Sequence, residues 1–325
     1  MKILIAGHDL KFINFYIEYL NETDHEVRID KWENHVGHNV QVSYELLNWA
    51  DIIFCEWGLG NSIFYSQNKR ENQKLIVRMH RQELETSYLS QANFEKIDKF
   101  ITVSPYIYEE FCRTFNIPRS KMNLIYNNVN LNKFKNINDS NRKFKIGMVG
   151  YLPKLKRLDI ALDIFTELYT KDNRYTLHFK GKRPEELSWL WRMDEEREYY
   201  EEQFQRIENS VWKNNVIFEP FGDVVEFYNN MEFVLSVSDI ESFHLAAAEG
   251  MACGAVPIIS NWEGSETIYY KDFIVENLET VPDYISHVRK NNKIYNESIR
   301  ENIKIFDEKS IINELNKVLF SKISL

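Results

Sequence analysis

The sequence predicts an α/β fold built from two facing Rossmann-like domains with a cleft between them. Its 325 residues exceed what one hydrophobic core usually organises. Short apolar runs alternate with amphipathic stretches along the chain, as in a parallel sheet covered by helices. A polar stretch rich in Asn and Lys, residues 131–142, interrupts this alternation once and is interpreted as a linker.

Six apolar runs in the first half are expected to be strands, because buried parallel strands are nearly continuous in apolar residues. They are residues 1–7, 25–29, 50–57, 74–80, 99–104 and 123–129. Residues 10–22 carry apolar side chains at helical spacing. The pattern predicts an N-terminal domain over residues 1–135.

Five further runs repeat the strand pattern in the second half, and the last of them is expected to complete the second sheet. They are residues 143–150, 175–181, 214–220, 231–238 and 255–260. Residues 158–170 form a predicted amphipathic helix. We expect a C-terminal domain over 143–305, followed by a terminal helix within 306–325 that packs back toward the N-terminal domain.

A long, acidic and aromatic helical stretch, residues 184–212, separates two of these strands. Its amphipathic pattern favours an ordinary solvated helix with Trp and Tyr packed inward. Recognition of an acceptor or of a partner is the alternative interpretation.

Composition excludes several classes of protein. The net charge of −9 argues against general nucleic-acid binding, for which a basic surface supplies most of the affinity. Cys55, Cys112 and Cys253 form neither a disulfide framework nor a CxxC metal motif, which fits a reducing cytosol. The N-terminal apolar run is too short for a signal peptide, and no run is long enough to span a membrane. We therefore expect a cytoplasmic protein.

The loop and helix after the strand at 231–238 carry the strongest chemical signal. Glu241 is expected at the helix start and Glu249 about two turns inside it, so both carboxylates would lie on one face. Backbone N–H groups near Ser242 to Leu245 would bind anionic oxygen, since a helix N-terminus attracts negative charge. On the residues alone, an equal alternative is that Glu241 caps the helix and Glu249 faces solvent.

The stretch ESFHLAAAEGMACGAVPIISNWEGSETI resembles the signature of the retaining family 4 glycosyltransferases, which belong to the glycosyl transferases group 1 and have the GT-B fold. RMH ending at His80, ITVSPY, YNNVNLNKF and VGYLPKLKRLD follow the family's order. The resemblance implies that Glu249 binds the ribose of a nucleotide. It also implies that Glu241 and the backbone of Ser242, Phe243, His244 and Leu245 address the donor sugar and phosphates.

The same resemblance assigns the leaving phosphate to Lys156, whose ammonium would offset the charge that develops there. It implies that His80 contacts the donor sugar, although a lone histidine is often structural. The family usually has arginine after the glycine that ends this strand, but Tyr151 follows Gly150 here. Arg157, or a residue such as Lys182 or Arg183, is expected to supply the missing charge; the alternative is that Lys156 and helix amides act alone.

Gly7 and His8 follow the first strand and are assigned to the acceptor side, where the family often has a glycine-rich loop. Arg78, Arg81 and Glu83 are further candidates for acceptor contacts, with exposed surface as the default. No metal is expected, because His35 and His38 lack a convincing third ligand.

Together with these features, the resemblance implies a retaining, metal-independent hexosyltransferase without a cofactor, which moves a sugar from a nucleotide donor, most often UDP in this family. The expected acceptor is a glycan or a lipid-linked molecule of bacterial cell-envelope polysaccharide synthesis, with peripheral contact to the inner face of the plasma membrane. A sugar-nucleotide epimerase or phosphorylase on the same fold is the alternative, as is a non-catalytic glycan-binding subunit.

Overall fold

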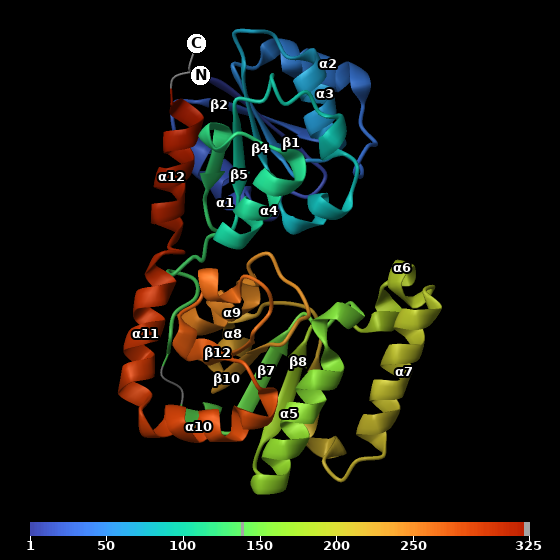
Figure 1. The fold of residues 1–325 in the computed structure, drawn as a ribbon, viewed down its shortest axis with the longest axis vertical. Coiled ribbons are helices and arrows are strands. Elements are labelled where there is room, and N and C mark those ends of the chain that lie inside the picture. The colour runs from blue at the N-terminus through green and yellow to red at the C-terminus, as the bar shows by residue number, and fades with distance from the viewer. Residues whose placement is uncertain (138–139, 322–325) are drawn as a thin grey trace. The chain divides into compact units, whose positions relative to one another are not determined.

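The computed structural model describes residues 1–137 and 140–321 and separates into two compact units (Figure 1). The first unit joins Met1–Asn128 with the stretch that begins at Glu308, and the second is Val129–Asp307. The predicted linker and the predicted terminal helix each lie partly outside the described residues. In the second unit, the linker residue Phe134 is buried and packs its ring against Tyr228.

The described residues of the first unit form a six-stranded parallel sheet in the order β2-β1-β3-β4-β5-β6. The strands are β1 (Lys2–Gly7), β2 (Glu26–Lys31), β3 (Ile52–Glu56), β4 (Lys74–Arg78), β5 (Lys99–Thr102) and β6 (Met122–Leu124). The helices are α1 (Asn14–Asn21), α2 (Val40–Trp49), α3 (Gly60–Asn68), α4 (Pro105–Phe115) and α12 (Glu308–Phe320).

The core of the first unit lies on both faces of its sheet, because successive side chains of a strand point to opposite faces. Leu4 of β1 packs with residues of α2, α3 and α4, whereas Ile5 packs with residues of α1 and α12. Tyr16 in α1 donates a hydrogen bond to Asn316 Oδ1 in α12 (2.7 Å). The C-terminal helix, red in Figure 1, therefore belongs to the core of the N-terminal unit.

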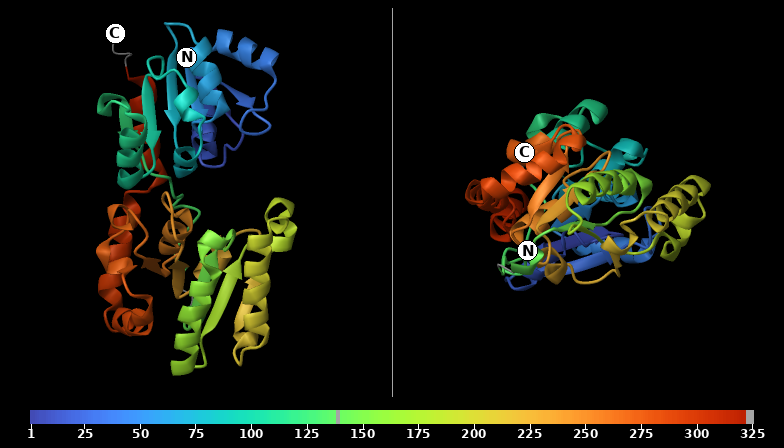
Figure 2. Two further views of the ribbon diagram at one scale, coloured as in Figure 1. Left: turned by 45° about the vertical axis from the view of Figure 1, so that its right-hand side comes forward. Right: turned by 90° about the horizontal axis from the view of Figure 1, so that it is seen from below.

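The described residues of the second unit form another six-stranded parallel sheet, in the order β12-β11-β10-β7-β8-β9. The strands are β7 (Lys145–Val149), β8 (Thr176–Lys180), β9 (Val216–Glu219), β10 (Phe233–Ser236), β11 (Val256–Ser260) and β12 (Ile274–Val275). The helices are α5 (Leu158–Lys171), α6 (Ser188–Trp191), α7 (Asp194–Glu208), α8 (Val225–Asn229), α9 (Leu245–Ala252), α10 (Val281–Lys290) and α11 (Asn292–Lys304). In both views of the side, α7 runs alongside α5 (Figures 1 and 2).

Several predicted elements differ from the structure. β2 extends to Lys31 and β6 ends at Leu124, whereas strands were predicted over residues 25–29 and 123–129. Residues 255–260 do not complete the second sheet, because the two-residue strand β12 extends its edge and is too short for a periodic pattern. The first helix begins at Asn14 rather than residue 10. The helical stretch 184–212 is broken into a 3₁₀ turn, α6 and α7.

Candidate functional site

The second sheet reverses its strand order between β7 and β10, which are paired neighbours although β8 and β9 separate them in sequence. Ligands of such sheets bind beyond the carboxyl ends of the strands at this reversal. Lys156, from the loop after β7, forms an ion pair with Glu241, from the loop after β10. The Asp239 N–H also donates to the Leu155 carbonyl (2.9 Å), which ties the two loops together.

Glu241 accepts its hydrogen bonds through one carboxylate oxygen, Oε1. Its Oε1 accepts from Lys156 Nζ and from Ser238 Oγ (2.7 Å), and His244 Nε2 lies 3.6 Å away. Burial alone would raise the pKa of Glu241, but His244, Lys156 and Ser238 together lower it, so the group is ionised at neutral pH. No described residue forms a hydrogen bond with Oε2, which leaves this oxygen for a ligand hydroxyl.

His244 precedes α9 with left-handed backbone (φ 56°), a conformation that glycine adopts most easily. Burial lowers its pKa to about 4, although Glu241 opposes the change, so the ring is neutral near pH 7. A carboxylate only accepts hydrogen bonds, so the ring proton belongs on Nε2, which faces Glu241. Nδ1 then accepts from the Ser236 hydroxyl, whose oxygen accepts from Trp262 Nε1 (3.2 Å).

Glu241 does not lie at the helix start, contrary to the sequence-based expectation. α9 begins at Leu245, and residues 241–244 form a loop that lets the Glu241 side chain reach Lys156. Glu249 lies inside α9, half-buried, and its Oε2 accepts from the Tyr228 hydroxyl (3.2 Å). Burial raises the pKa of Glu249 to about 7, and Tyr228 only partly opposes this rise. The solvent-facing alternative for Glu249 is therefore wrong.

Tyr151, which occupies the position of the expected arginine, is 1% exposed. Its ring packs edge-on against Phe179 of β8 (5.4 Å) and Phe218 of β9 (5.5 Å). Burial raises the pKa of Tyr151 to about 12, while the charge of Arg183 limits that rise. Gly150 before it has positive φ (75°) and open space where a Cβ would lie. Tyr151 therefore anchors this loop in the core and leaves Gly150 at the surface.

The cations considered as substitutes for the expected arginine have other contacts. Arg157 binds the Asp159 carboxylate (2.8 Å) and Asp239 Oδ1 (2.6 Å). Lys182 is exposed, with its ammonium 5.7 Å from the Phe221 ring centroid. Arg183 stacks on Phe218, at 4.5 Å. Of these cations and Lys156, only Lys156 pairs with Glu241, whereas Arg157 pairs with Asp239 of the same loop after β10.

The first sheet reverses its strand order between β1 and β3, and the predicted acceptor-side residues lie there. A Cβ on Gly7 would lie 2.7 Å from the Glu56 carbonyl, so this glycine allows β1 and β3 to approach. His8 is half-buried, with its ring 4.8 Å from that of His35 and 5.9 Å from that of Trp57.

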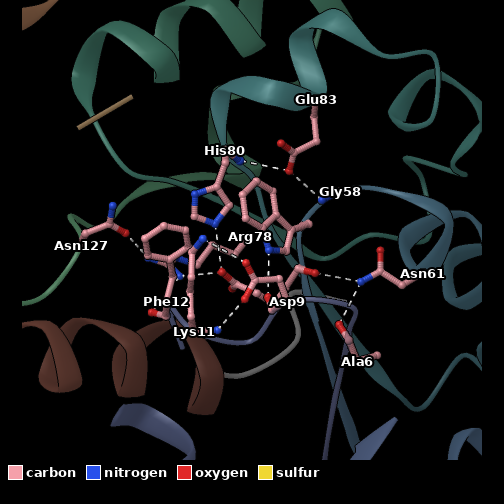
Figure 3. A network of polar contacts seen from close by, with 12 residues as sticks. Ala6, Asp9, Lys11, Phe12, Gly58, Asn61, Arg78, His80, Glu83 and Asn127 are labelled. Carbon is pink, nitrogen blue, oxygen red and sulfur yellow. Dashed lines mark hydrogen bonds and ion pairs between the residues drawn. The ribbon is translucent and has the colours of Figure 1, made fainter. Parts of the chain in front are cut away.

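His80 belongs to a buried polar network at the carboxyl ends of the strands of the first sheet (Figure 3). Glu56 Oε1 accepts from His80 Nε2 (2.9 Å) and from Arg78 Nη1 (2.9 Å), and Arg78 Nη2 donates to Asn127 (2.5 Å). Burial lowers the pKa of His80, although Glu56 opposes the shift. A neutral ring that donates through Nε2 has Nδ1 as an acceptor, and the Trp57 ring covers one face at 4.1 Å.

Arg78 and Glu83, two further candidates for acceptor contacts, are buried and form hydrogen bonds within this network. Arg78 is 2% exposed and Glu83 is fully buried. Glu83 Oε1 accepts from the backbone N–H of Gly58 (2.8 Å) and of His80 (3.0 Å), as Figure 3 shows. Burial raises the pKa of Glu83 to about 8 despite these bonds. Arg81 is half-buried and pairs with Glu85.

Sequence reasoning missed Glu56 and Trp57 because both fall at the end of an apolar run that was interpreted only as a strand. A carboxylate and an indole at the carboxyl end of a parallel strand were the available signal.

The described residues contain no group of His, Cys, Asp and Glu that could hold a metal ion. His38 instead stacks on Trp32 at 3.8 Å. In the described part of the chain, every helix is too short or too polar to cross a bilayer.

The fold is the GT-B fold, and solved glycosyltransferases share it. HepE from Anabaena, solved with UDP-glucose, is 16% identical with a TM-score of 0.73, over 99% of this chain and 100% of that chain. A glycosyltransferase from Rickettsia africae is 14% identical with a TM-score of 0.74, over 99% of both chains. Sucrose-phosphate synthase from Thermosynechococcus elongatus is 15% identical with a TM-score of 0.69, over 98% of both chains.

Within this class, the chain belongs to the glycosyl transferases group 1, whose family model matches residues 130–306, more than half of the sequence. An uncharacterized glycosyltransferase from Methanocaldococcus jannaschii is 28% identical over 173 residues. That match covers 51% of this chain and only 41% of the length of the archaeal protein.

Proposed function

We propose that this protein transfers a sugar from a UDP-sugar to an acceptor hydroxyl. The observation that carries the proposal is the Lys156–Glu241 ion pair at the strand-order reversal of the second sheet. This unit contains the part of the chain that matches the group 1 family. HepE, which shares the fold, was solved with UDP and with UDP-glucose.

In the proposed complex, Lys156 binds the diphosphate and stabilises the charge that develops on the leaving phosphate oxygen. An ammonium has three N–H donors, so the bond to Glu241 leaves donors for the phosphate. Glu241 Oε2 accepts from a hydroxyl of the donor sugar, and the first turn of α9 adds N–H groups for anionic oxygen. Glu249 accepts from the ribose hydroxyls.

For the chemical step, we propose that the acceptor hydroxyl attacks from the face that the diphosphate leaves, so the sugar keeps its anomeric configuration. The leaving phosphate oxygen accepts the acceptor proton. The positive charge that this step needs comes from Lys156 and α9, without a metal or an organic cofactor. His80 contacts the donor sugar through Nδ1, an acceptor that suits a sugar hydroxyl.

For the acceptor, we propose a glycan or a lipid-linked molecule of cell-envelope polysaccharide synthesis, reached in the cytoplasm at the membrane surface. The described cysteines Cys55, Cys112 and Cys253 are free thiols, which is compatible with a reducing compartment. The family resemblance supports the class of acceptor.

A binding screen with UDP-, GDP- and CMP-sugars tests the donor assignment. We expect UDP-glucose at about 100 times its dissociation constant to stabilise the protein by about 2.7 kcal/mol in thermal unfolding. Incubation with UDP-glucose should release UDP and, in the transfer product or by slow hydrolysis, a sugar of unchanged anomeric configuration, observed by NMR. Stabilisation by GDP- or CMP-sugars alone would exclude UDP, and no stabilisation by any of the nucleotide sugars would exclude the function.

Affinity for UDP-glucose should increase about tenfold between about pH 6 and pH 8. The pKa of Glu249 is about 7 in the free protein, and only the ionised carboxylate accepts two ribose hydroxyls, so binding favours the deprotonated form. Calorimetry of the parent, of Glu249→Gln and of an exposed control, Glu279→Gln, measures this dependence. A parent and a Glu249→Gln variant with the same pH profile would contradict the assignment.

A further inference from the structure

Helix α7, for which the sequence favoured an ordinary solvated role, contacts the loop that carries Lys156. This loop, residues 150–157, joins β7 to α5, and we call it the donor loop. We propose that Glu196, Tyr199 and Tyr200 of α7 are positioning residues that fix the donor loop and thereby place Lys156 for catalysis. The proposal rests on the proposed function and names a structural determinant of the same site.

The three side chains bind backbone atoms at and next to the donor loop. The Tyr200 hydroxyl donates to the Tyr151 carbonyl (2.9 Å), and Glu196 Oε2 accepts from the Lys154 N–H (2.8 Å). The Tyr199 hydroxyl accepts from the Asp159 N–H (3.0 Å) and donates to Asp159 Oδ1 (2.7 Å). These bonds therefore fix the backbone on both sides of Lys156.

The spacing of these residues makes them one surface of the helix. Positions i, i+3 and i+4 lie on the same face of an α-helix, and residues 196, 199 and 200 have this spacing. Tyr200 is fully buried, and Tyr199 and Glu196 are half-buried. The rings of Tyr199 and Tyr200 pack edge-on at 5.0 Å. The side chains therefore have little freedom to leave the loop, and their contacts are mutually dependent.

The donor loop needs external support because of its backbone conformation. Arg157 has left-handed backbone (φ 60°), which costs a residue other than glycine about 1–2 kcal/mol. Such conformations persist when surrounding contacts determine them. Arg157 is held by Asp159, which itself binds the Tyr199 hydroxyl. The α7 contacts thus extend to the residue that directly follows Lys156.

A variant that removes only a hydroxyl tests the proposal. Tyr200→Phe keeps the buried ring and loses the bond to Tyr151. The matched control is Tyr284→Phe, because Tyr284 donates to another backbone carbonyl of the same unit, that of Pro257 (3.2 Å), away from the donor loop. Tyr199→Phe and Glu196→Gln repeat the test at the other two contacts.

Hydrogen exchange and enzyme kinetics distinguish a specific effect of α7 on the donor loop from a general effect on folding. Amide hydrogen exchange of residues 151, 152 and 154–157 should become faster in Tyr200→Phe than in the parent or in Tyr284→Phe, at similar thermal unfolding midpoints. Turnover of UDP-glucose should show a kcat about tenfold lower with little change in KM. In a Lys156→Ala background, Tyr200→Phe should lower kcat less than twofold further, because both act through the same ammonium.

Unchanged exchange of the loop in Tyr200→Phe would overturn the proposal, as would a kcat equal to that of Tyr284→Phe. A full tenfold loss in the Lys156→Ala background would show an effect independent of Lys156 and would also overturn it. Failure of the parent to bind any of the UDP-, GDP- and CMP-sugars is a different result. It would reject the proposed function, while the exchange measurement would still report whether α7 holds the loop.

Discussion

Replacement of Lys156 by alanine should lower the kcat for UDP-glucose by about 10²–10³-fold. The ammonium is the fixed positive charge beside Glu241, and removal of one preorganised group that stabilises developing charge costs about this factor. The KM for the donor should change less, because the charge on the phosphate oxygen grows mainly in the transition state. Steady-state release of UDP measures both constants.

The matched control is Lys171→Ala, an exposed lysine of the same unit that lies at the end of α5. It should retain parental kcat. Glu241→Gln should resemble Lys156→Ala, since it removes the charge that holds the lysine. Activity within a factor of a few of the parent in both site variants, with intact folding by circular dichroism, would remove the catalytic assignment.

Tyr151→Arg restores the arginine that the family usually has, but it should destabilise the protein by about 3 kcal/mol or more. The position is 1% exposed and lies among the rings of Phe179 and Phe218. A guanidinium there loses aromatic packing and has to be removed from water. The thermal unfolding midpoint should fall by about 6 °C or more, and affinity for UDP should not improve.

Tyr151→Phe is the control for this substitution, because it preserves the ring. The Tyr151 hydroxyl has no hydrogen-bond partner among the described residues, so its removal should change stability by about 1 kcal/mol at most. A Tyr151→Arg variant that is as stable as the parent and binds UDP more tightly would show that the loop accepts a phosphate ligand at this position.

The sheets were predictable from sequence because buried parallel strands are continuous apolar runs, and β1, β3 to β5 and β7 to β11 fall within the predicted runs. β2 extends to Lys31, two residues past its run, and β6 covers only the start of its run. Strand β12 was not predictable, since a strand of two residues shows no periodic pattern. The family resemblance placed both Lys156 and Glu241 at the donor site, but it did not predict the geometry of their ion pair. Glu241 reaches the lysine from a loop, and helical spacing therefore gave the wrong relation to Glu249.

Long-range contacts explain what the sequence could not indicate. Glu56 appeared only as the end of a strand, yet it binds Arg78, the last residue of β4, and His80, which follows β4. The inward face of α7 was predicted as packing, whereas Tyr200 binds the donor loop and Tyr199 binds Asp159 next to that loop. Polar partners of this kind depend on tertiary neighbours, and periodicity reports only which face is buried.

The packing of α12 also has a consequence for the order of folding. Lys74 of β4 donates to the Val318 carbonyl (2.6 Å) and to the Leu319 carbonyl (3.1 Å), so this buried ammonium caps a helix far away in sequence. The N-terminal sheet is synthesised first, yet the part of one face that α12 covers stays exposed until α12 has left the ribosome. The middle of the chain, Val129–Asp307, can complete its own core before the two ends of the chain complete theirs.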